Sequence, residues 1–229
     1  MSERVVVLTG AGISADSGLA TFRDAGGLWE GHRPEEVATP EAFAADPEMV
    51  HRFYNARRLQ LQEAEPNDAH RALVDFEKAV PEFLLVTQNV DDLHERAGSR
   101  KLLHMHGELK RIKCSFCDNQ RWEEREISME TVCEKCGQSG GMRPAVVWFG
   151  EMPLHMDEIF RALDSCTLFV SIGTSGNVYP AAGFVDAANL AGARTVELNL
   201  EPSTTASAFR ECIHGRAVEI VPEFVKSFL

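Results

Sequence analysis

The stretch RVVVLTGAGISA, residues 4–15, decides the fold class. Its first half is apolar and β-branched, which is typical of a buried strand, and the glycines after it predict a tight turn that leads into a helix. Further strands are predicted at residues 83–87, 168–172 and 194–198, and helices at 156–163 and 180–190. Strands that alternate with helices indicate a parallel sheet covered on both faces, so we predict a Rossmann-like α/β fold. Ligands of such sheets bind at the carboxyl ends of the strands.

Two stretches interrupt this alternation. Residues 34–65 have a helical pattern, and residues 108–143 have little apolar periodicity but contain four paired cysteines. We therefore expect a single domain, 1–229, built from two parts. The large Rossmann-like part is expected to comprise residues 1–33, 66–107 and 144–229. The small part is expected to comprise a helical insert, 34–65, and a zinc ribbon, 108–143.

The paired cysteines are Cys114, Cys117, Cys133 and Cys136, with fifteen residues between the two pairs. This spacing can bring four thiolates around one ion in the tetrahedral arrangement that zinc prefers. Four protein ligands leave no open position, so we predict a structural zinc ion. A nucleic-acid-binding ribbon is the alternative, but residues 108–143 contain seven Lys or Arg and seven Asp or Glu, and thus no basic excess.

The overall charge also disfavours nucleic acid. The 229 residues include 23 basic and 35 acidic side chains, a formal net charge of −12, which serves solubility and attracts cationic partners such as lysine-rich peptides. No apolar run approaches the roughly 18 residues of a membrane span, and we see no secretory leader. We expect a cytoplasmic protein that binds neither nucleic acid nor membrane. Thiols are reduced there, so no disulfide is expected for Cys166 and Cys212.

The glycine turn fits a loose dinucleotide-binding pattern. Residues 10–15 have the spacing of that pattern with Ala15 in the last place, and glycines let backbone amides approach a pyrophosphate. A strand-to-helix turn needs glycine even when it binds nothing, so the turn alone decides little. A dehydrogenase would also need an acidic residue after a second strand about twenty positions on, where residues 26–31 indicate a loop.

Several motifs taken together resemble the sirtuin family, whose bacterial class III members are lysine deacetylases and desuccinylases. The motifs are GAGIS at 10–14, SGL at 17–19, TFR at 21–23, TQNVD at 87–91, HG at 106–107, the four cysteines, GTS at 173–175 and NLE at 199–201. The resemblance extends from Val5 to about Val221. One departure is Ala20, where many sirtuins have proline.

The resemblance implies an enzyme that consumes NAD and transfers the acyl group of a lysine to ADP-ribose, giving nicotinamide, O-acyl-ADP-ribose and free lysine. It implies catalytic roles for His106 as general base and for Asn89 and Asp91 in the nicotinamide pocket. From the residues alone, His106 and His104 cannot be told apart, and both fit a packed histidine. The implied cofactor-binding residues are Gly10, Ala11, Gly12, Ile13, Ser14, Ala15, Thr21, Phe22, Arg23, Trp29, Gln88, Asn89, Val90, Asp91, Gly173, Thr174, Ser175, Asn199, Leu200, Glu201 and Ala217.

For the substrate, the resemblance implies an acyl-lysine peptide that adds a strand between two enzyme segments by β-augmentation. The implied segments are Val147, Trp148, Phe149, Gly150 and Glu151 on one side and Gly176, Asn177, Val178 and Tyr179 on the other. Tyr54 and Arg57 share a helix face, and this pair resembles the class III marker for succinyl- and malonyl-lysine, because phenol and guanidinium both bind carboxylates. By spacing alone, a solvated arginine on an amphipathic helix is the favoured interpretation of Arg57. We expect a monomer.

Three alternatives remain from the sequence. Mono-ADP-ribosyl transfer to protein would use the same cofactor site and a different attacking group. A non-catalytic NAD-sensing or zinc-ribbon module is the second alternative. His106, Asn89 and Asp91 are all present, which argues against it, because such a module would need none of them. A redox dehydrogenase is the third.

Overall fold

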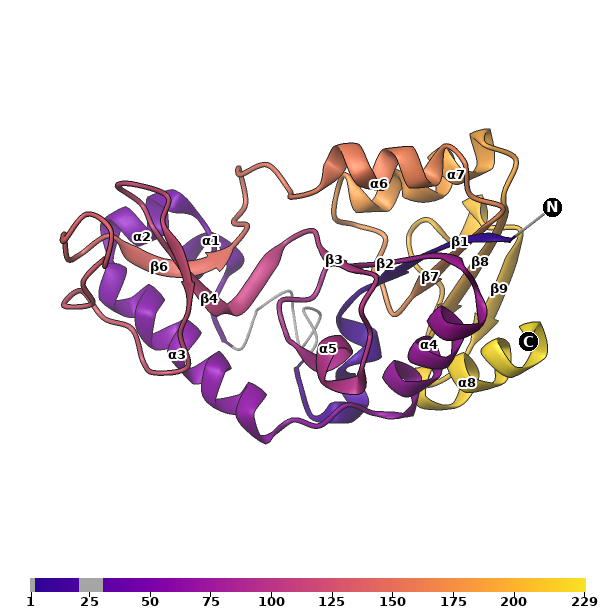
Figure 1. The fold of residues 1–229 in the computed structure, drawn as a ribbon, viewed down its shortest axis with the longest axis horizontal. Coiled ribbons are helices and arrows are strands. Elements are labelled where there is room, and N and C mark those ends of the chain that lie inside the picture. Colours follow the sequence, from indigo (N-terminus) through magenta and orange to yellow (C-terminus); the bar gives the residue numbers. More distant parts are fainter. Residues whose placement is uncertain (1–2, 21–30) are drawn as a thin grey trace.

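The computed structural model describes residues 3–20 and 31–229 and confirms the predicted fold class. Six strands of this part of the chain form a parallel sheet in the order β3-β2-β1-β7-β8-β9 (Figure 1). The strands are β1 (Arg4–Thr9), β2 (Glu82–Thr87), β3 (Leu102–His104), β7 (Leu168–Ile172), β8 (Arg194–Asn199) and β9 (Glu211–His214). β1 and β7 lie at the centre and are apolar almost throughout, as expected for strands covered on both faces.

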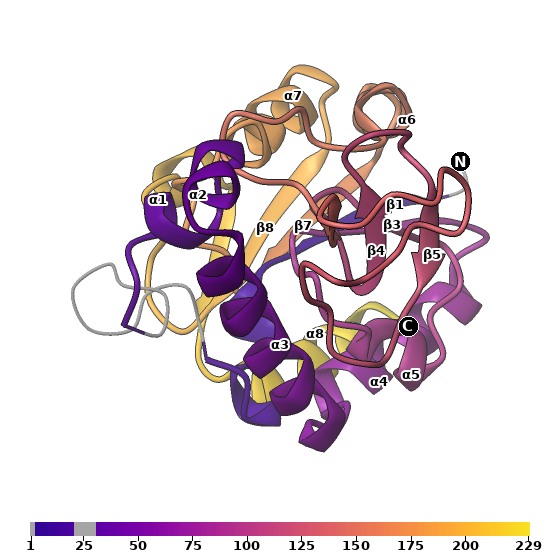
Figure 2. The same cartoon turned by 90° about the vertical axis from the view of Figure 1, so that its left-hand side faces the viewer.

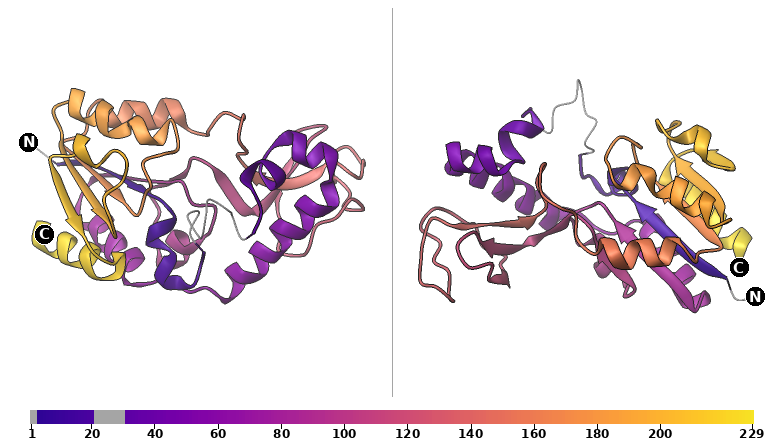
Figure 3. Two further views of the ribbon diagram at one scale, coloured as in Figure 1. Left: turned by 180° about the vertical axis from the view of Figure 1, so that it is seen from behind. Right: turned by 90° about the horizontal axis from the view of Figure 1, so that it is seen from above.

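Helices cover the two faces of this sheet. One face packs on α4 (Asp68–Ala79) and α8 (Ala217–Phe228), and the other on α6 (Met156–Leu163) and α7 (Phe184–Leu190). The alternation within β1 shows the division, because Val5 and Val7 belong to the first core and Val6 and Leu8 to the second. Figure 3 shows the two layers from behind. The predicted strands and the helix at 156–163 are found within one or two residues. The predicted helix at 180–190 begins four residues later, as α7, because a 3-10 turn (Ala181–Gly183) precedes it; α4, α8, β3 and β9 were not predicted.

A second, antiparallel sheet has the order β5-β4-β6. It consists of β4 (Gly107–Cys114), β5 (Gln120–Trp122) and β6 (Met142–Val146), so the predicted boundary between residues 143 and 144 falls inside β6. The helical insert packs on this sheet through α3 (Pro47–Glu63), which contacts β4 and, through His51, the Met142 carbonyl of β6. It contains α1 (Pro34–Val37), α2 (Pro40–Ala45) and α3, seen in Figure 2, in place of the predicted helix pair. Each of these helices begins with proline, and the Thr39 and Asp46 side chains cap α2 and α3.

The glycine turn departs from the prediction. It leads into two 3-10 turns, Ala11–Ile13 and Ala15–Ser17, and not into an α-helix. An α-helix would pair the Ile13 carbonyl with the Ser17 amide, but that carbonyl accepts a hydrogen bond from the Asn67 side-chain amide at 2.8 Å. Gly18, with φ of +85°, then ends the second turn. A long helix dipole aimed at a pyrophosphate is therefore absent from residues 11–20.

Among the described residues, the longest helices are too short or too polar to cross a membrane.

Candidate active site

The glycine turn lies directly on the end of β7. The amides of Gly10 and Gly12 donate to the carbonyls of Ile172 and Gly173 at 3.0 and 2.9 Å. A Cβ on Gly12 would lie 2.7 Å from the Gly173 Cα, and a Cβ on Gly173 would lie 2.5 Å from the Ile13 nitrogen. Side chains at either position would separate the two backbones, so both glycines are required for this close approach. Three predicted cofactor residues are thereby brought together.

A buried polar cluster lies below this turn, where β2 ends. The Ser14 hydroxyl donates to the Asp91 carboxylate at 3.1 Å and accepts from the Asn89 side-chain amide at 3.2 Å. The Leu93 amide donates to the other Asp91 oxygen at 3.1 Å. Burial raises the pKa of Asp91 to about 6, because an ionised carboxylate is disfavoured away from water. The cluster therefore offers donors and acceptors of fixed direction, which the recognition of an amide requires.

A second layer of buried side chains supports this cluster, and these residues were not predicted to be functional. His70 approaches the Ser14 hydroxyl at 3.5 Å and contacts Asn67 through its other ring nitrogen at 3.0 Å. Its ring meets that of His94 edge-on, 4.8 Å between centroids. Burial lowers the pKa of both rings, that of His70 to about 4. The only local signal is that Asn67 and His70 have the spacing of a helix-capping box.

The structure separates the two histidines that the sequence could not. Nδ1 of His106 lies 3.1 Å from the Gln88 carbonyl, an acceptor, so this nitrogen holds the proton and Nε2 is left as the base of the neutral ring. Burial lowers the pKa of His106, which favours this neutral form. His104 uses both nitrogens, since Nδ1 contacts the Asn89 carbonyl at 3.1 Å and Nε2 contacts Glu95 at 2.6 Å. His106 is thus better suited to accept a proton.

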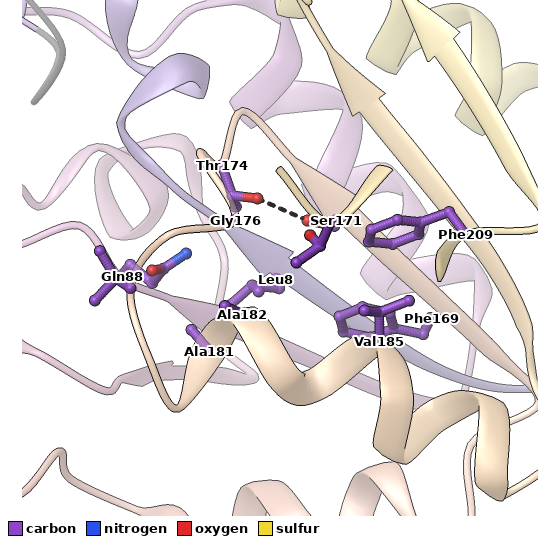
Figure 4. Close-up of a pocket in the computed structure, with 12 residues that line it drawn as sticks. Leu8, Gln88, Phe169, Ser171, Thr174, Gly176, Ala181, Ala182, Val185 and Phe209 are labelled. Atoms are coloured by element: carbon purple, nitrogen blue, oxygen red, sulfur yellow. Dashed lines mark hydrogen bonds between the residues drawn. The ribbon is translucent and has the colours of Figure 1, made fainter. Parts of the chain in front are cut away.

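Several of the predicted cofactor-binding residues gather where β7 and β8 end. The Asn199 side-chain amide donates to the Thr174 carbonyl at 2.8 Å, and the Ser175 hydroxyl accepts from the Asn177 amide at 3.3 Å. Leu200 and Glu201 are exposed beyond β8, and Ala217 begins α8. A pocket near this edge is lined by Gln88, Thr174, Gly176 and Val178 together with apolar side chains of β7 and α7 (Figure 4). Thr21, Phe22, Arg23 and Trp29 lie outside the described residues.

Tyr54 and Arg57 project from α3 next to the segment that follows β6. Tyr54 is 1% exposed and belongs to the core that also contains Trp148. The Arg57 guanidinium lies 4.7 Å from the Phe53 ring centroid. Trp148 to Gly150 form a turn in which the Val147 amide donates to the His106 carbonyl at 2.8 Å and the Phe149 amide donates to the Ala38 carbonyl at 2.9 Å. The segment therefore joins the turn that contains His106, between β3 and β4, to the helical insert.

The four cysteine sulfurs meet at one point of the small antiparallel sheet. They lie within 4.8 Å of one another, with 3.8 Å between those of Cys114 and Cys136 and 3.6 Å between those of Cys117 and Cys133. A tetrahedron with Zn–S bonds of about 2.3 Å requires sulfur separations of about 3.8 Å, so these residues fit one structural zinc ion, as predicted.

Comparisons with known proteins agree with this arrangement. The model of the Sir2 family matches residues 10–180. The NAD-dependent protein deacylase of Salmonella typhimurium is 58% identical over 229 residues, covering 99% of this chain and 84% of the relative. That of Bdellovibrio bacteriovorus is 55% identical over 230 residues, covering 99% and 97%.

Solved structures extend the similarity to three dimensions. A Sir2 homologue in complex with NAD is 40% identical, has a TM-score of 0.91 and covers 99% of this chain and 89% of its own. A Sir2 mutant with a deacetylated p53 peptide and 3′-O-acetyl-ADP-ribose is 29% identical, with a TM-score of 0.87 and coverages of 99% and 94%. The chain belongs to the Sir2 family, the sirtuins.

Proposed function

We propose that this chain removes acyl groups from protein lysines with NAD as co-substrate, and that it accepts succinyl and malonyl groups as well as acetyl. One observation carries the proposal: the Ser14, Asn89 and Asp91 cluster lies under the glycine turn, and His106, with Nε2 left as a base, is held by the adjacent Gln88 carbonyl. The deacylase names of relatives at 55–58% identity support the NAD-dependent reaction.

Asn89 and Asp91 would bind the amide of nicotinamide and orient the NAD for loss of that group. A carboxyl whose pKa is raised to about 6 accepts hydrogen bonds when it is ionised and can donate one when it is protonated, so it can meet either side of an amide. Ser14 orients the Asn89 and Asp91 side chains, because its hydroxyl is hydrogen-bonded to both of them. Departure of nicotinamide exposes the ribose carbon to the carbonyl oxygen of the acylated lysine.

His106 would then accept the proton of a ribose hydroxyl at Nε2. The hydroxyl oxygen would attack the acyl carbon, and the lysine amine would leave with a proton. Water would then add to the acyl cation that bridges the two ribose oxygens, giving O-acyl-ADP-ribose beside the free lysine. The pyrophosphate would approach the backbone at Gly10 to Gly12, and the adenosine half would lie toward Ser175 and Asn199. The zinc ion holds the small sheet together and takes part in no step.

We propose that the acyl chain ends at Tyr54 and Arg57. A side chain that is 1% exposed, as Tyr54 is, can form the floor of a pocket, and a phenol and a guanidinium are both donors to a carboxylate. The peptide backbone would lie between residues 147–151 and 176–179. The backbone amides of Val147, Trp148 and Phe149 already donate within the chain. The peptide would therefore meet backbone carbonyls, which are acceptors, along residues 147–151.

The test is a panel of acetyl-, malonyl- and succinyl-lysine peptides assayed for nicotinamide release, with mass spectrometry of the products. We expect O-acyl-ADP-ribose, and loss of turnover in His106→Ala. A modified protein acceptor would indicate ADP-ribosyl transfer, and absence of nicotinamide release with every peptide would indicate a non-catalytic module.

Acyl specificity is tested with Arg57→Met. We expect desuccinylation to fall by about 10- to 100-fold more than deacetylation, because a hydrogen-bonded charge pair to the carboxylate is lost. Arg52→Met is the matched control, since this arginine lies on the same helix and is 68% exposed. If both activities fell equally in Arg57→Met, the arginine would serve the fold or the cofactor, and acidic-acyl recognition would be refuted.

A further inference from the structure

The indole of Trp148 makes a specific contact inside the core of the small part. Trp148 is 2% exposed, and its Nε1 donates a hydrogen bond to the Tyr54 hydroxyl oxygen at 2.8 Å. An indole N–H is a donor only and has no lone pair to offer in return. In this hydrogen bond Trp148 must therefore be the donor and the Tyr54 oxygen the acceptor.

This direction constrains the proton of the phenol. A phenol has one proton, and at its contact with Trp148 the Tyr54 oxygen acts as acceptor, so the proton points away from the indole. Burial raises the pKa of Tyr54 above its ordinary value, so the phenol stays protonated at neutral pH. The O–H of Tyr54 therefore donates to a group other than Trp148.

We propose that Trp148 determines acyl specificity as a positioning residue: by donating to the Tyr54 oxygen, it orients the phenol to donate to the carboxylate of an acidic acyl chain. This inference rests on the proposed recognition of that carboxylate by Tyr54 and Arg57. A carboxylate accepts hydrogen bonds only, so a phenol turned with its oxygen toward it would repel it.

Charged side chains of the zinc-bearing sheet hold Trp148 in place. The Arg143 guanidinium lies 3.8 Å from the Trp148 ring centroid and is paired with Glu151. The other Glu151 oxygen accepts from the Trp148 amide at 2.9 Å, and Lys113 lies 3.5 Å from this carboxylate. Arg143 and Lys113 are register partners on β6 and β4, next to the pair that contains Cys114. The zinc-bearing sheet thus sets the position of the indole that orients Tyr54.

The experiment measures the ratio of kcat/KM for a succinyl-lysine peptide to that for the acetyl-lysine peptide of the same sequence. Trp148→Phe keeps an aromatic ring and removes the N–H. We expect the ratio to fall about tenfold, and any general loss of activity cancels in it. Trp122→Phe is the matched control, because Trp122 is 47% exposed on β5, and the ratio should stay unchanged. Benzothienylalanine at position 148 replaces the N–H by sulfur at nearly constant shape and should give the same fall.

A double-mutant cycle with Tyr54→Phe separates this role from a packing role. We expect Trp148→Phe to lower the ratio in the wild-type background and to lower it no further in the Tyr54→Phe background. An unchanged ratio in both position-148 variants, or additive losses in the cycle, would overturn the role of Trp148 while leaving the acidic-acyl proposal intact. If Tyr54→Phe itself left the ratio unchanged, the acidic-acyl proposal would fail, and this inference with it.

Discussion

Asp91→Asn should stabilise the protein at pH 8 while it abolishes turnover. Burial raises the pKa of Asp91 from 3.8 to about 6, and each tenfold change in proton affinity corresponds to about 1.4 kcal/mol. Holding the ionised carboxylate in the folded protein therefore costs up to about 3 kcal/mol. The folded state binds more protons than the unfolded state between about pH 4 and 6, so stability falls as pH rises through this window, and the cost is complete above it.

Asparagine fits the same partners without that cost. Its oxygen can accept from the Leu93 amide, as Asp91 does at 3.1 Å. The side-chain amide of the new asparagine can donate to one lone pair of the Ser14 hydroxyl oxygen, and Asn89 continues to donate to the other. The Ser14 hydroxyl can then donate its own proton toward His70. The expected gain is on the order of 5 to 10 °C in Tm at pH 8 for a chain of this length, and none near pH 4.

Urea and thermal unfolding of the wild type and Asp91→Asn at pH 4, 6 and 8 measure this difference, with nicotinamide release recorded on the same samples. Asp92→Asn is the control, since Asp92 is the adjacent acid and pairs with Lys110 at 2.7 Å, so its loss should weaken the fold. A difference between Asp91→Asn and wild type that does not change with pH, or a less stable Asp91→Asn protein at pH 8, would refute the reasoning.

Two further predictions concern the zinc site and His104. Cys133→Ser should lose the zinc ion and unfold residues 107–146, because the core around the site is small: within residues 3–20 and 31–229 it contains five buried residues, two of which are zinc ligands. Cys212→Ser, at an exposed cysteine, should keep the zinc ion. Metal analysis and amide hydrogen exchange measure both effects, and a Cys133→Ser protein that retained zinc would contradict the prediction. Burial lowers the pKa of His104, but the hydrogen bond and charge of Glu95 outweigh it and raise the pKa overall, so this pair stabilises the fold at low pH and is lost as pH rises through the raised pKa. Glu95→Gln should therefore lower the free energy of unfolding by less than about 1 kcal/mol at pH 6 and leave it unchanged at pH 9, as measured by urea unfolding. The expected effect is small because the pair is partly exposed to solvent. An equal loss at both pH values would exclude the ion pair as the cause.

Local patterns of the sequence were enough to predict the fold class, the four central strands and the metal site. Apolar runs such as residues 168–172 are short, continuous and β-branched, and the structure has β7 over the same residues. The cysteine spacing is likewise a local constraint, because each pair lies on one tight turn. The glycine turn was only partly predictable. Its glycines predicted a tight turn, whereas the contact with Gly173 and the 3-10 geometry depend on residues distant in sequence, among them Asn67, more than fifty residues away.

The rest was decided by tertiary contacts. His104 and His106 look alike in sequence. They differ because α5 (Leu93–Ala97) places Glu95 next to the His104 ring, whereas the Gln88 carbonyl holds Nδ1 of His106 and leaves its Nε2 as a base. Trp148 and Tyr54 are 94 positions apart, so no periodicity or spacing predicts that one donates to the other. Periodicity and spacing report what neighbours along the chain impose, whereas the direction of a buried hydrogen bond depends on strand register and helix packing, which only the folded chain defines.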